Sequence, residues 1–525
     1  MSRTAVTMHV VLTSVVLGLV VQGTIDAQPL EPQRRFNVVE ATIGDIHRAM
    51  HAGELTARQL VQLYLDRIEA YDKQGPAVNS IIVVNPNALV RAAELDRQFA
   101  ESGMVGPLHG IPVIVKDNYD THDIPTTAGS LSLSGSIPPD DAFQVRRIRE
   151  AGAIVIAKSN MAEFAFTPYE TVGSMLPGHT RNPYALNRVP AGSSGGTGAA
   201  VAASFGTVGM GTDTGNSIRG PSSHNALVGI RSTMGLTSRD GIIPLYYDKD
   251  IGGPMARTVA DAVAVFDVIA GYDPGDPVTA VSQRHRTEHY TNFLDADALN
   301  GARVGVMRQW SNRDGADDEV LQRFEEALDA MRSQGATIVD PVTISEMDEL
   351  RRSGLWCRRF KYDINAYLAT LGPDAPVKNL DEIVASRRTH PSIRPRLEFF
   401  QQVEGSPDED PSCQRALVNQ EELRVAVRRQ LEQHQLDVMV YPTWANPPRL
   451  IGDLNTPHGD NSQDLAPGTG FPAITVPMGY VRDGLPVGLQ IFGAAWSEPT
   501  LIAIAYSFEQ STRHRRAPAT TPPLP

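Results

Sequence analysis

The sequence predicts an α/β fold built around a large core. The chain has 525 residues, 41% of them hydrophobic and 20% charged, which is ordinary for a globular protein. Short apolar runs bounded by turn residues are typical of buried strands, and longer segments with an apolar face are typical of amphipathic helices. Both kinds of segment occur along the chain. Its length permits two or three domains, but no repeat and no break in composition requires a second one.

Two amphipathic helices are predicted near the start of the domain. Their start signals are Thr42 and Thr56, each followed three residues later by a side chain that can complete a capping box, Asp45 and Gln59 respectively. Gly53 separates the two helices. The apolar side chains of the second helix fall on one face, which favours packing on the core over a membrane-surface role.

Further elements are predicted from the remaining apolar patterns. The predicted strands are Ile111–Val115, Ile154–Ala157, Val208–Gly211 and Leu436–Pro442, with two more near residues 470–477 and 484–490. The predicted helices include one closing at Gly152 and those at Asp261–Ile269, Asp318–Ser333, Glu421–Gln433 and Glu498–Gln510.

The stretch Ala191–Pro221 concentrates Gly, Ser and Thr around two apolar segments, and we interpret it as the scaffold of an active site. In the loop Gly192–Gly196, small residues permit close backbone approach, and the Ala-rich run Ala199–Ser204 suits a tightly packed helix. A second turn, Thr212–Ser217, presents a hydroxyl beside several backbone N–H groups, as an oxyanion hole requires. A flexible linker would not contain these apolar runs.

Other loop functions fit this stretch less well. It contains no phosphate-binding G-x-x-x-x-G-K-[ST] string and no G-x-G-x-x-G after a strand, which disfavours nucleotide binding. The G-x-S-x-G elbow of hydrolases is not matched either, because the string around Ser217 ends in Arg219.

Lys116 directly follows the predicted strand Ile111–Val115 in the string GPLHGIPVIVKDN. The end of a buried strand is a catalytic position in α/β sheets. By itself, however, a single lysine is more often a solvated surface charge.

Together, the stretch Ala191–Pro221 and the lysine string resemble the amidase signature family. Its members look like G-G-S-S-G-G-(S/T) followed by G-T-D-(T)-G-G-S-(I)-R-x-P, with G-I-P-(V/I)-x-(V/I)-K-D-N upstream. The resemblance covers most of residues 38–515. It implies a single large domain in which a central mixed β-sheet is covered by helices on both faces.

The resemblance also implies a Ser–cis-Ser–Lys site. Ser217 would be the nucleophile, Ser193 the bridging serine behind a cis peptide bond from Gly192, and Lys116 the base. The implied oxyanion-hole donors are the backbone N–H groups of Thr214, Gly215, Asn216 and Ser217.

Two residues depart from the family pattern. Ala191 replaces the commoner Gly, and Asn216 replaces the second Gly before the nucleophile. Asn tolerates left-handed backbone angles better than most residues, so we expect the turn to survive while the side chain narrows the site. Asp213 and Arg219 are expected to buttress the loops as a charge pair. The predicted substrate-binding residues are Ser130, Phe166, Tyr169, Tyr246 and Trp444, although aromatic side chains are more often part of a core.

The predicted reaction is hydrolysis of an acyl C–N bond in a linear amide, an aryl amide or a carbamate, through an acyl-enzyme on Ser217. Ser193 would relay the proton to neutral Lys116, so that none of the 13 histidines is needed. Two alternatives remain. The catalytic A subunit of a glutamine-dependent tRNA amidotransferase would use the same site to release ammonia, and a non-catalytic binding protein would have kept only the fold.

The charge and the cysteine count limit the partners. A net charge of −13 does not support nucleic-acid binding. Cys357 and Cys413 stand without a C-x-x-C pair or a histidine cluster, which argues against structural zinc, and the sequence leaves open whether they pair. We expect neither a metal nor a cofactor. A homodimer is left open.

Three segments stand apart from the family pattern. Residues 1–27 combine Arg3, the apolar run Val10–Val21 and a small residue at Ala27, which predicts a cleaved signal peptide and a secreted or periplasmic protein without stable membrane insertion. An uncleaved anchor and a wrongly assigned start codon are the alternatives. Residues 280–435 are expected to form a variable region that caps the site, and the Pro-rich tail 516–525 is expected to be disordered.

Overall fold

An 11-stranded mixed β-sheet runs through the described part of the chain, in the order β1-β3-β2-β4-β6-β5-β10-β11-β9-β7-β8. The structure is a computed structural model that describes residues 1–2, 7–8, 36–482 and 484–525. Residues from Asn37 to Pro525 form one compact unit. The predicted signal peptide lies almost wholly outside the described residues.

The strands next to the candidate site are completely buried. Every residue of β2, β3 and β4 is buried, so both faces of this part of the sheet are covered. The strands are β1 Ile81–Val84, β2 Pro112–Lys116, β3 Ile154–Ser159, β4 Val208–Asp213, β5 Val228–Arg231, β6 Ile251–Ala256, β7 Arg303–Val306, β8 Thr337–Val339, β9 Val438–Pro442, β10 Ala473–Val481 and β11 Leu485–Phe492. The predicted α/β fold with a mixed sheet is therefore confirmed.

Helices pack against this sheet along its length, with α5 on β2 and β4, α7 on β6, and α16 on β10. The helices are α1 Ile43–His51, α2 Ala57–Ile68, α3 Ala88–Ser102, α4 Phe143–Glu150, α5 Gly195–Ala202, α6 Arg219–His224, α7 Val259–Ile269, α8 Arg308–Ser311, α9 Asp318–Ser333, α10 Met347–Ser353, α11 Phe360–Thr370, α12 Leu380–Ser386, α13 Arg394–Gln401, α14 Pro411–Gln433, α15 Leu465–Thr469 and α16 Glu498–Thr512. Among the described residues, no helix has both the length and the apolar character needed to cross a membrane.

The start signals of the helices account for their bounds. Both predicted capping boxes form, at Thr42 with Asp45 and at Thr56 with Gln59. Helix α14 begins ten residues before the predicted start, at Pro411, because Asp410 caps it and proline is suited to the first turn.

The direction of two neighbouring strands positions the site. β2 runs parallel to β4, with Val115 opposite Met210. Parallel neighbours end at the same edge of a sheet, so Lys116 at the end of β2 and Thr212 near the end of β4 emerge together.

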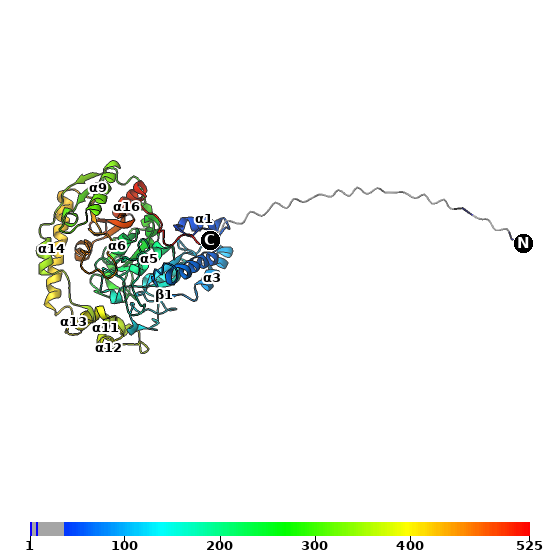
Figure 1. The fold of residues 1–525 in the computed structure, drawn as a ribbon, viewed down its shortest axis with the longest axis horizontal. Coiled ribbons are helices and arrows are strands. Elements are labelled where there is room, and N and C mark those ends of the chain that lie inside the picture. The colour runs from blue at the N-terminus through cyan, green and yellow to red at the C-terminus, as the bar shows by residue number, and fades with distance from the viewer. Residues whose placement is uncertain (3–6, 9–35, 483) are drawn as a thin grey trace. The chain divides into compact units, whose positions relative to one another are not determined.

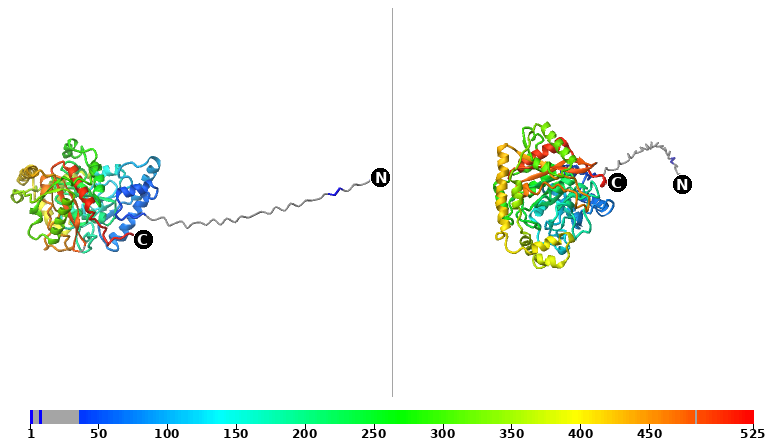
Figure 2. Two further views of the ribbon diagram at one scale, coloured as in Figure 1. Left: turned by 90° about the horizontal axis from the view of Figure 1, so that it is seen from above. Right: turned by 60° about the vertical axis from the view of Figure 1, so that its left-hand side comes forward.

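The region 280–435 divides into two parts. β7 and β8 pair in parallel and extend the sheet beyond β9, so the prediction that the whole region caps the site is too broad. Helices α11, α12 and α13, which we call the cap helices, lie together on one flank, away from α1 and α3 (Figures 1 and 2). Their apolar side chains form one core cluster with Phe164, Phe166 and Leu245.

The cap is also held by a covalent bond. Cys357, just before α11, forms a disulfide with Cys413 in the first turn of α14. The sequence left open whether Cys357 and Cys413 pair, and in this structure they do.

The C-terminal tail packs on the domain, and its end lies near α1 in Figure 1. The guanidinium of Arg67 on α2 donates to the carbonyl oxygens of Thr521 and Pro522, each at 2.8 Å, and Thr521 is only 1% exposed. The prediction of a disordered tail is therefore wrong. Proline lacks a backbone N–H but keeps its carbonyl acceptor, and a buried arginine uses that acceptor here.

Candidate active site

Lys116 lies at the end of β2 with its side chain completely buried. Its Nζ atom donates to the Oγ atom of Ser193 at 2.8 Å and to the Oγ1 atom of Thr212 at 2.7 Å. Both partners are neutral hydroxyls. Among the described residues, no carboxylate forms an ion pair with this amine.

This environment favours the neutral amine. Burial lowers the pKa of Lys116 to about 7, although the negative charges of Asp250 and Asp213 oppose the shift. Lys158 on β3 is equally buried but has a different role. Its Nζ atom lies 3.7 Å from a carboxylate oxygen of Asp117 and donates to the carbonyl of Tyr119, as expected of a structural lysine.

The position of Ser193 depends on its neighbours in the chain. The Gly192–Ser193 peptide bond is cis, as the family resemblance implies. A Cβ atom on Gly192 would lie 2.5 Å from the carbonyl oxygen of Glu170 and 2.7 Å from that of Thr167, so only glycine fits. Ala191 adopts a φ of +63°, in the region that favours glycine.

Ser217 lies in the turn after β4, at the edge of a cavity of about 910 Å³. Thr214, Gly215 and Asn216 line the same cavity. Within the described residues, the backbone N–H groups of Gly215, Asn216 and Ser217 donate no hydrogen bond to the protein. They are therefore available to a developing oxyanion.

A buried ion network supports this turn. Asp213 pairs with Arg219 at 3.1 Å and with Arg231 at 2.9 Å, and it accepts the N–H group of Ile218 at 3.0 Å. Burial alone would raise the pKa of Asp213, but the two guanidinium groups hold it well below its usual value. The predicted pair of Asp213 and Arg219 is confirmed.

Comparison with known proteins agrees with this geometry. The amidase family model matches residues 59–502. The chain belongs to the amidase signature family. It is 35% identical over 503 residues to a probable amidase of Arabidopsis thaliana, covering 92% of both chains. It is also 32% identical over 496 residues to the A subunit of the glutamyl-tRNA(Gln) amidotransferase of Streptomyces coelicolor, covering 90% of this chain and 96% of the relative.

Among solved structures, the native peptide amidase from Stenotrophomonas maltophilia superimposes with a TM-score of 0.83. It is 37% identical, and the match covers 93% of this chain and all of the peptide amidase chain. An amidase family protein from Bacillus anthracis matches with a TM-score of 0.80 at 31% identity, covering 92% of both chains. The fold and the amide-hydrolase class are thus shown for this member of the amidase signature family.

Three of the five predicted substrate-binding residues line the cavity in this amidase signature protein: Phe166, Tyr169 and Tyr246. The other two do not. Ser130 is fully buried and hydrogen-bonded to Ser132 at 2.8 Å. Trp444 is only 2% exposed and packs behind Tyr169, against which its ring lies edge-on at 6.4 Å. The sequence prediction does not hold for these two, because both are turned into the core.

The side chain of Asn216, where the amidase signature family has glycine, is buried. Its Nδ2 atom donates to Asp460 at 3.0 Å, and its backbone does not adopt a positive φ. Burial raises the pKa of Asp460 to about 6. The left-handed angle that would favour glycine is therefore not needed here, and the Asn216 side chain instead ties the oxyanion turn to the loop around Asp460.

Sequence reasoning missed several residues around the site. Thr212 and Asn118 contact each other at 3.1 Å beside Lys116, and both belong to the family motifs, D-N after the lysine and G-T-D before the turn. Asp250 accepts the hydroxyl of Thr214 at 2.5 Å. Trp356 and Arg358, from the variable region, line the cavity without any sequence signal.

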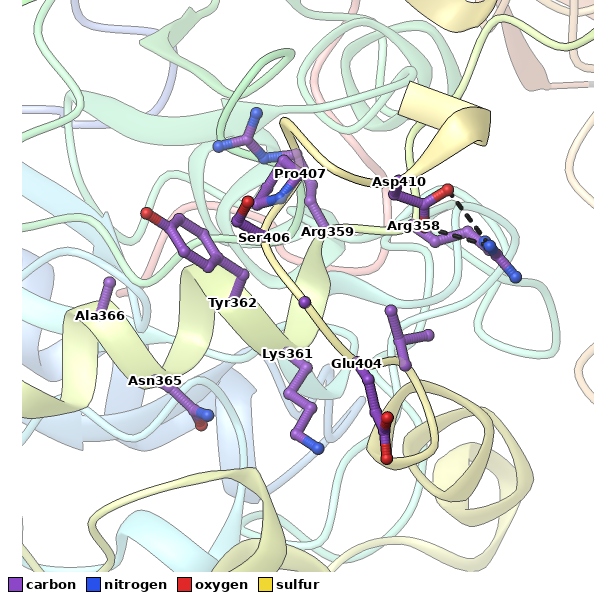
Figure 3. A pocket seen from close by; sticks show the side chains of 12 residues that line it. Arg358, Arg359, Lys361, Tyr362, Asn365, Ala366, Glu404, Ser406, Pro407 and Asp410 are labelled. Carbon is purple, nitrogen blue, oxygen red and sulfur yellow. Dashed lines mark hydrogen bonds and ion pairs between the residues drawn. The ribbon is translucent and has the colours of Figure 1, made fainter. Parts of the chain in front are cut away.

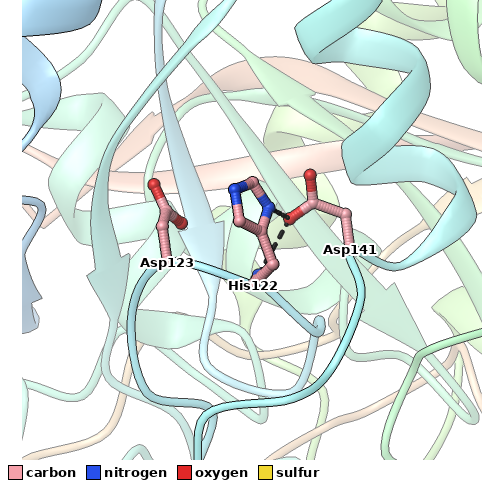
Figure 4. A group of neighbouring side chains, drawn as sticks. All are labelled: His122, Asp123 and Asp141. Carbon is pink, nitrogen blue, oxygen red and sulfur yellow. Dashed lines mark hydrogen bonds and ion pairs between the residues drawn. The ribbon is translucent and has the colours of Figure 1, made fainter.

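One group among the described residues has the spacing of a metal site: His122, Asp123 and Asp141 (Figure 4). Arg149 forms ion pairs with both carboxylates, at 2.6 Å to Asp123 and 3.1 Å to Asp141. Since a guanidinium already compensates these charges, we interpret the group as a structural ion network.

Proposed function

We propose that this protein is an exported amidase that hydrolyses a linear amide with a large, peptide-like acyl part, through an acyl-enzyme on Ser217. The observation that carries the proposal is the hydrogen-bonded pair of Lys116 and Ser193, next to a cavity lined by Ser217 and by unpaired backbone N–H groups. These are the base, relay, nucleophile and oxyanion donors that amide hydrolysis requires.

The proposed reaction starts with neutral Lys116. The Oγ atom of Ser217 attacks the amide carbon while its proton passes to Ser193, and the proton of Ser193 passes to Lys116. The carbonyl oxygen becomes an oxyanion held by the backbone N–H groups of the turn. The proton then returns through Ser193 to the leaving nitrogen, the C–N bond breaks, and the acyl group remains on Ser217. Water hydrolyses this ester by the same proton path.

The size and lining of the cavity support a large acyl part. At about 910 Å³, it lies near the upper end of the roughly 300–1,000 Å³ typical of drug-sized ligands. Phe166, Tyr246 and Phe400 supply apolar surface, and Arg396 adds a positive charge to the lining. A small aliphatic amide would leave most of this volume unfilled. The similarity to peptide amidase supports a peptide amide as the substrate class.

The similarity to the A subunit of glutamyl-tRNA(Gln) amidotransferase supports a second candidate function, release of ammonia from glutamine for a partner protein. Purification from the native host separates the two candidates. A stoichiometric second polypeptide together with glutaminase activity would favour the amidotransferase, whereas a single chain that cleaves peptide amides favours the amidase.

Two features support export. The apolar run Val10–Val21 precedes the small residue Ala27, and the domain holds a disulfide between Cys357 and Cys413, a bond typical of oxidising compartments. The intact mass of protein from the native host tests this. A mature chain that begins near Gln28 supports export, and a full-length cytoplasmic chain contradicts it.

The decisive functional experiment is an activity screen of the purified protein. Acyl anilides, fatty amides, carbamates, glutamine and peptide amides are compared at equal concentration, with ammonia or amine release as the readout. We expect the highest kcat/KM on peptide amides. Preference for any other class would assign a different substrate to the same site.

A further inference from the structure

A second cavity has a volume of about 560 Å³, and Figure 3 shows the side chains that line it. It lies between helix α11 and the loop 403–410 that precedes α14. Arg358 lines both cavities, so the two cavities lie next to each other at this residue. We call this second cavity the cap pocket.

We propose that the cap pocket binds the amino-terminal part of a peptide amide whose carboxy-terminal amide lies at Ser217. This inference rests on the proposed function and adds to it a substrate length, a direction and a recognised end group.

The border between the two cavities is held by an ion pair and a disulfide. Arg358 pairs with Asp410 at 3.1 Å, as Figure 3 shows. The preceding residue, Cys357, lines the active-site cavity and is bonded to Cys413, three residues after Asp410. An ion pair and a disulfide thus connect the same two segments, which suits a border between two binding sites.

The cations of the cap pocket already have partners. Besides the pairing of Arg358, Arg359 pairs with Asp363 at 2.6 Å, and Lys361 donates to the carbonyl oxygen of Gln401 at 2.8 Å. A ligand anion would have to compete with these contacts. The pocket therefore does not favour a carboxylate or phosphate.

Glu404 and Tyr362 are among the pocket side chains that have no partner within the described residues. Glu404 forms neither a hydrogen bond nor an ion pair, and Tyr362 is 51% exposed with no hydrogen bond from its side chain. Figure 3 shows Tyr362 projecting from α11 and Glu404 from the loop before α14. An unpaired carboxylate suits an ammonium group, and an exposed aromatic ring suits an apolar or aromatic side chain.

A peptide with a free amino terminus offers both features, an ammonium group at its end and side chains along its length. A fatty amide offers neither, because its acyl chain carries no donor for Glu404. The charge pattern therefore favours an oligopeptide amide over a lipid amide.

The test uses peptide amides of one to six residues that share the same carboxy-terminal residue, each with a free or an acetylated amino terminus. Wild type, Tyr362→Ala and Glu404→Gln are compared. The matched controls are Tyr272→Ala and Glu432→Gln, an exposed tyrosine and an exposed glutamate outside both cavities. kcat and KM are measured for each substrate.

We expect Tyr362→Ala to raise KM for the longer peptides about fivefold, with kcat and the cleavage of the one-residue amide unchanged. We expect Glu404→Gln to remove most of the preference for a free amino terminus. The proposal is overturned if both variants have the same kcat and KM as wild type for long and short substrates. It is also overturned if the control variants show the same change in KM. If wild type cleaves no amide and no serine probe reacts at Ser217, the proposed function fails and the cap pocket proposal fails with it.

Discussion

The Oγ1 atom of Thr212 lies 2.7 Å from the Nζ atom of Lys116. The same hydroxyl oxygen is 3.1 Å from the side-chain nitrogen of Asn118, so it accepts from the amide while contacting the amine. Ser193 contacts the amine at 2.8 Å. Lys116 is thus held between two hydroxyls, and its contact with Thr212 keeps its amine beside Ser193, the proposed bridging serine.

Thr212→Val should lower kcat about threefold to tenfold, because the isosteric side chain removes one hydrogen bond worth about 0.5–1.5 kcal/mol from the base. Steady-state kinetics on a peptide amide measures the effect. Thr212→Ser keeps the hydroxyl and should stay near wild type. Equal loss in both variants would mean that the methyl group, rather than the hydroxyl, is required.

Ser217→Ala should abolish turnover without unfolding the protein, since the turn accommodates a smaller side chain. A fluorophosphonate should add one adduct to wild type, on Ser217, and none to the variant. Intact mass and peptide mapping measure this, with thermal unfolding as the folding control. An adduct on another serine would move the nucleophile elsewhere.

Activity should rise with pH through about 7, because Lys116, the proposed base, can accept a proton only when neutral and burial lowers its pKa to that value. At a pH below this value the amine is protonated, so the acidic limb of kcat/KM against pH should report it. Lys116→Arg should be inactive at every pH, since a guanidinium stays protonated. An acidic limb that persists in a residually active Lys116→Ala variant would assign the base to another group.

Asp250→Asn should move this acidic limb to lower pH. The negative charge of Asp250 raises the pKa of Lys116, opposing the effect of burial, and the variant removes that charge. Asp250 also accepts from Thr214 and from the backbone of Leu245, so kcat should fall as the oxyanion turn loosens. pH-rate profiles of both proteins separate the effects. If kcat falls but the acidic limb stays at the same pH, Asp250 supports the turn without affecting the pKa of Lys116.

Asp213→Asn should destabilise the fold by about 3–5 kcal/mol, because Arg219 and Arg231 would remain buried without a counter-charge. The pKa of Asp213 is held below its unfolded value. Its stabilisation is therefore complete above the unfolded pKa and is lost as pH falls toward the folded pKa. Urea denaturation at neutral and acidic pH measures both effects. If the variant is as stable as wild type at neutral pH, the ion network of Asp213 does not stabilise the fold.

Local patterns are enough to place much of this fold. The predicted helix Asp318–Ser333 has the observed bounds, and the strand at Val208 differs only at its end. Lys116, Ser193 and Ser217 can be found from sequence because their motifs are contiguous strings, and the structure places Lys116 against Ser193.

The errors arise where a side chain's surroundings come from distant segments. Trp444 and Ser130 are common kinds of pocket residue, but only the packed structure shows that they face the core. The proline content of the tail predicts disorder, yet Arg67, more than 450 positions earlier, supplies its partners. Trp356 and Arg358 reach the cavity from a region with no motif.

The disulfide between Cys357 and Cys413 ties a segment that lines the binding cavity to helix α14. Protein produced in a reducing cytosol would carry two thiols, and the segment with Trp356 and Arg358 would lose its covalent tie to α14. Lys116 and Ser217, the proposed base and nucleophile, lie on other elements, so the chemical step should be unaffected. Enzyme from reducing and oxidising expression hosts should therefore differ in selectivity among long substrates while sharing the same kcat on short ones.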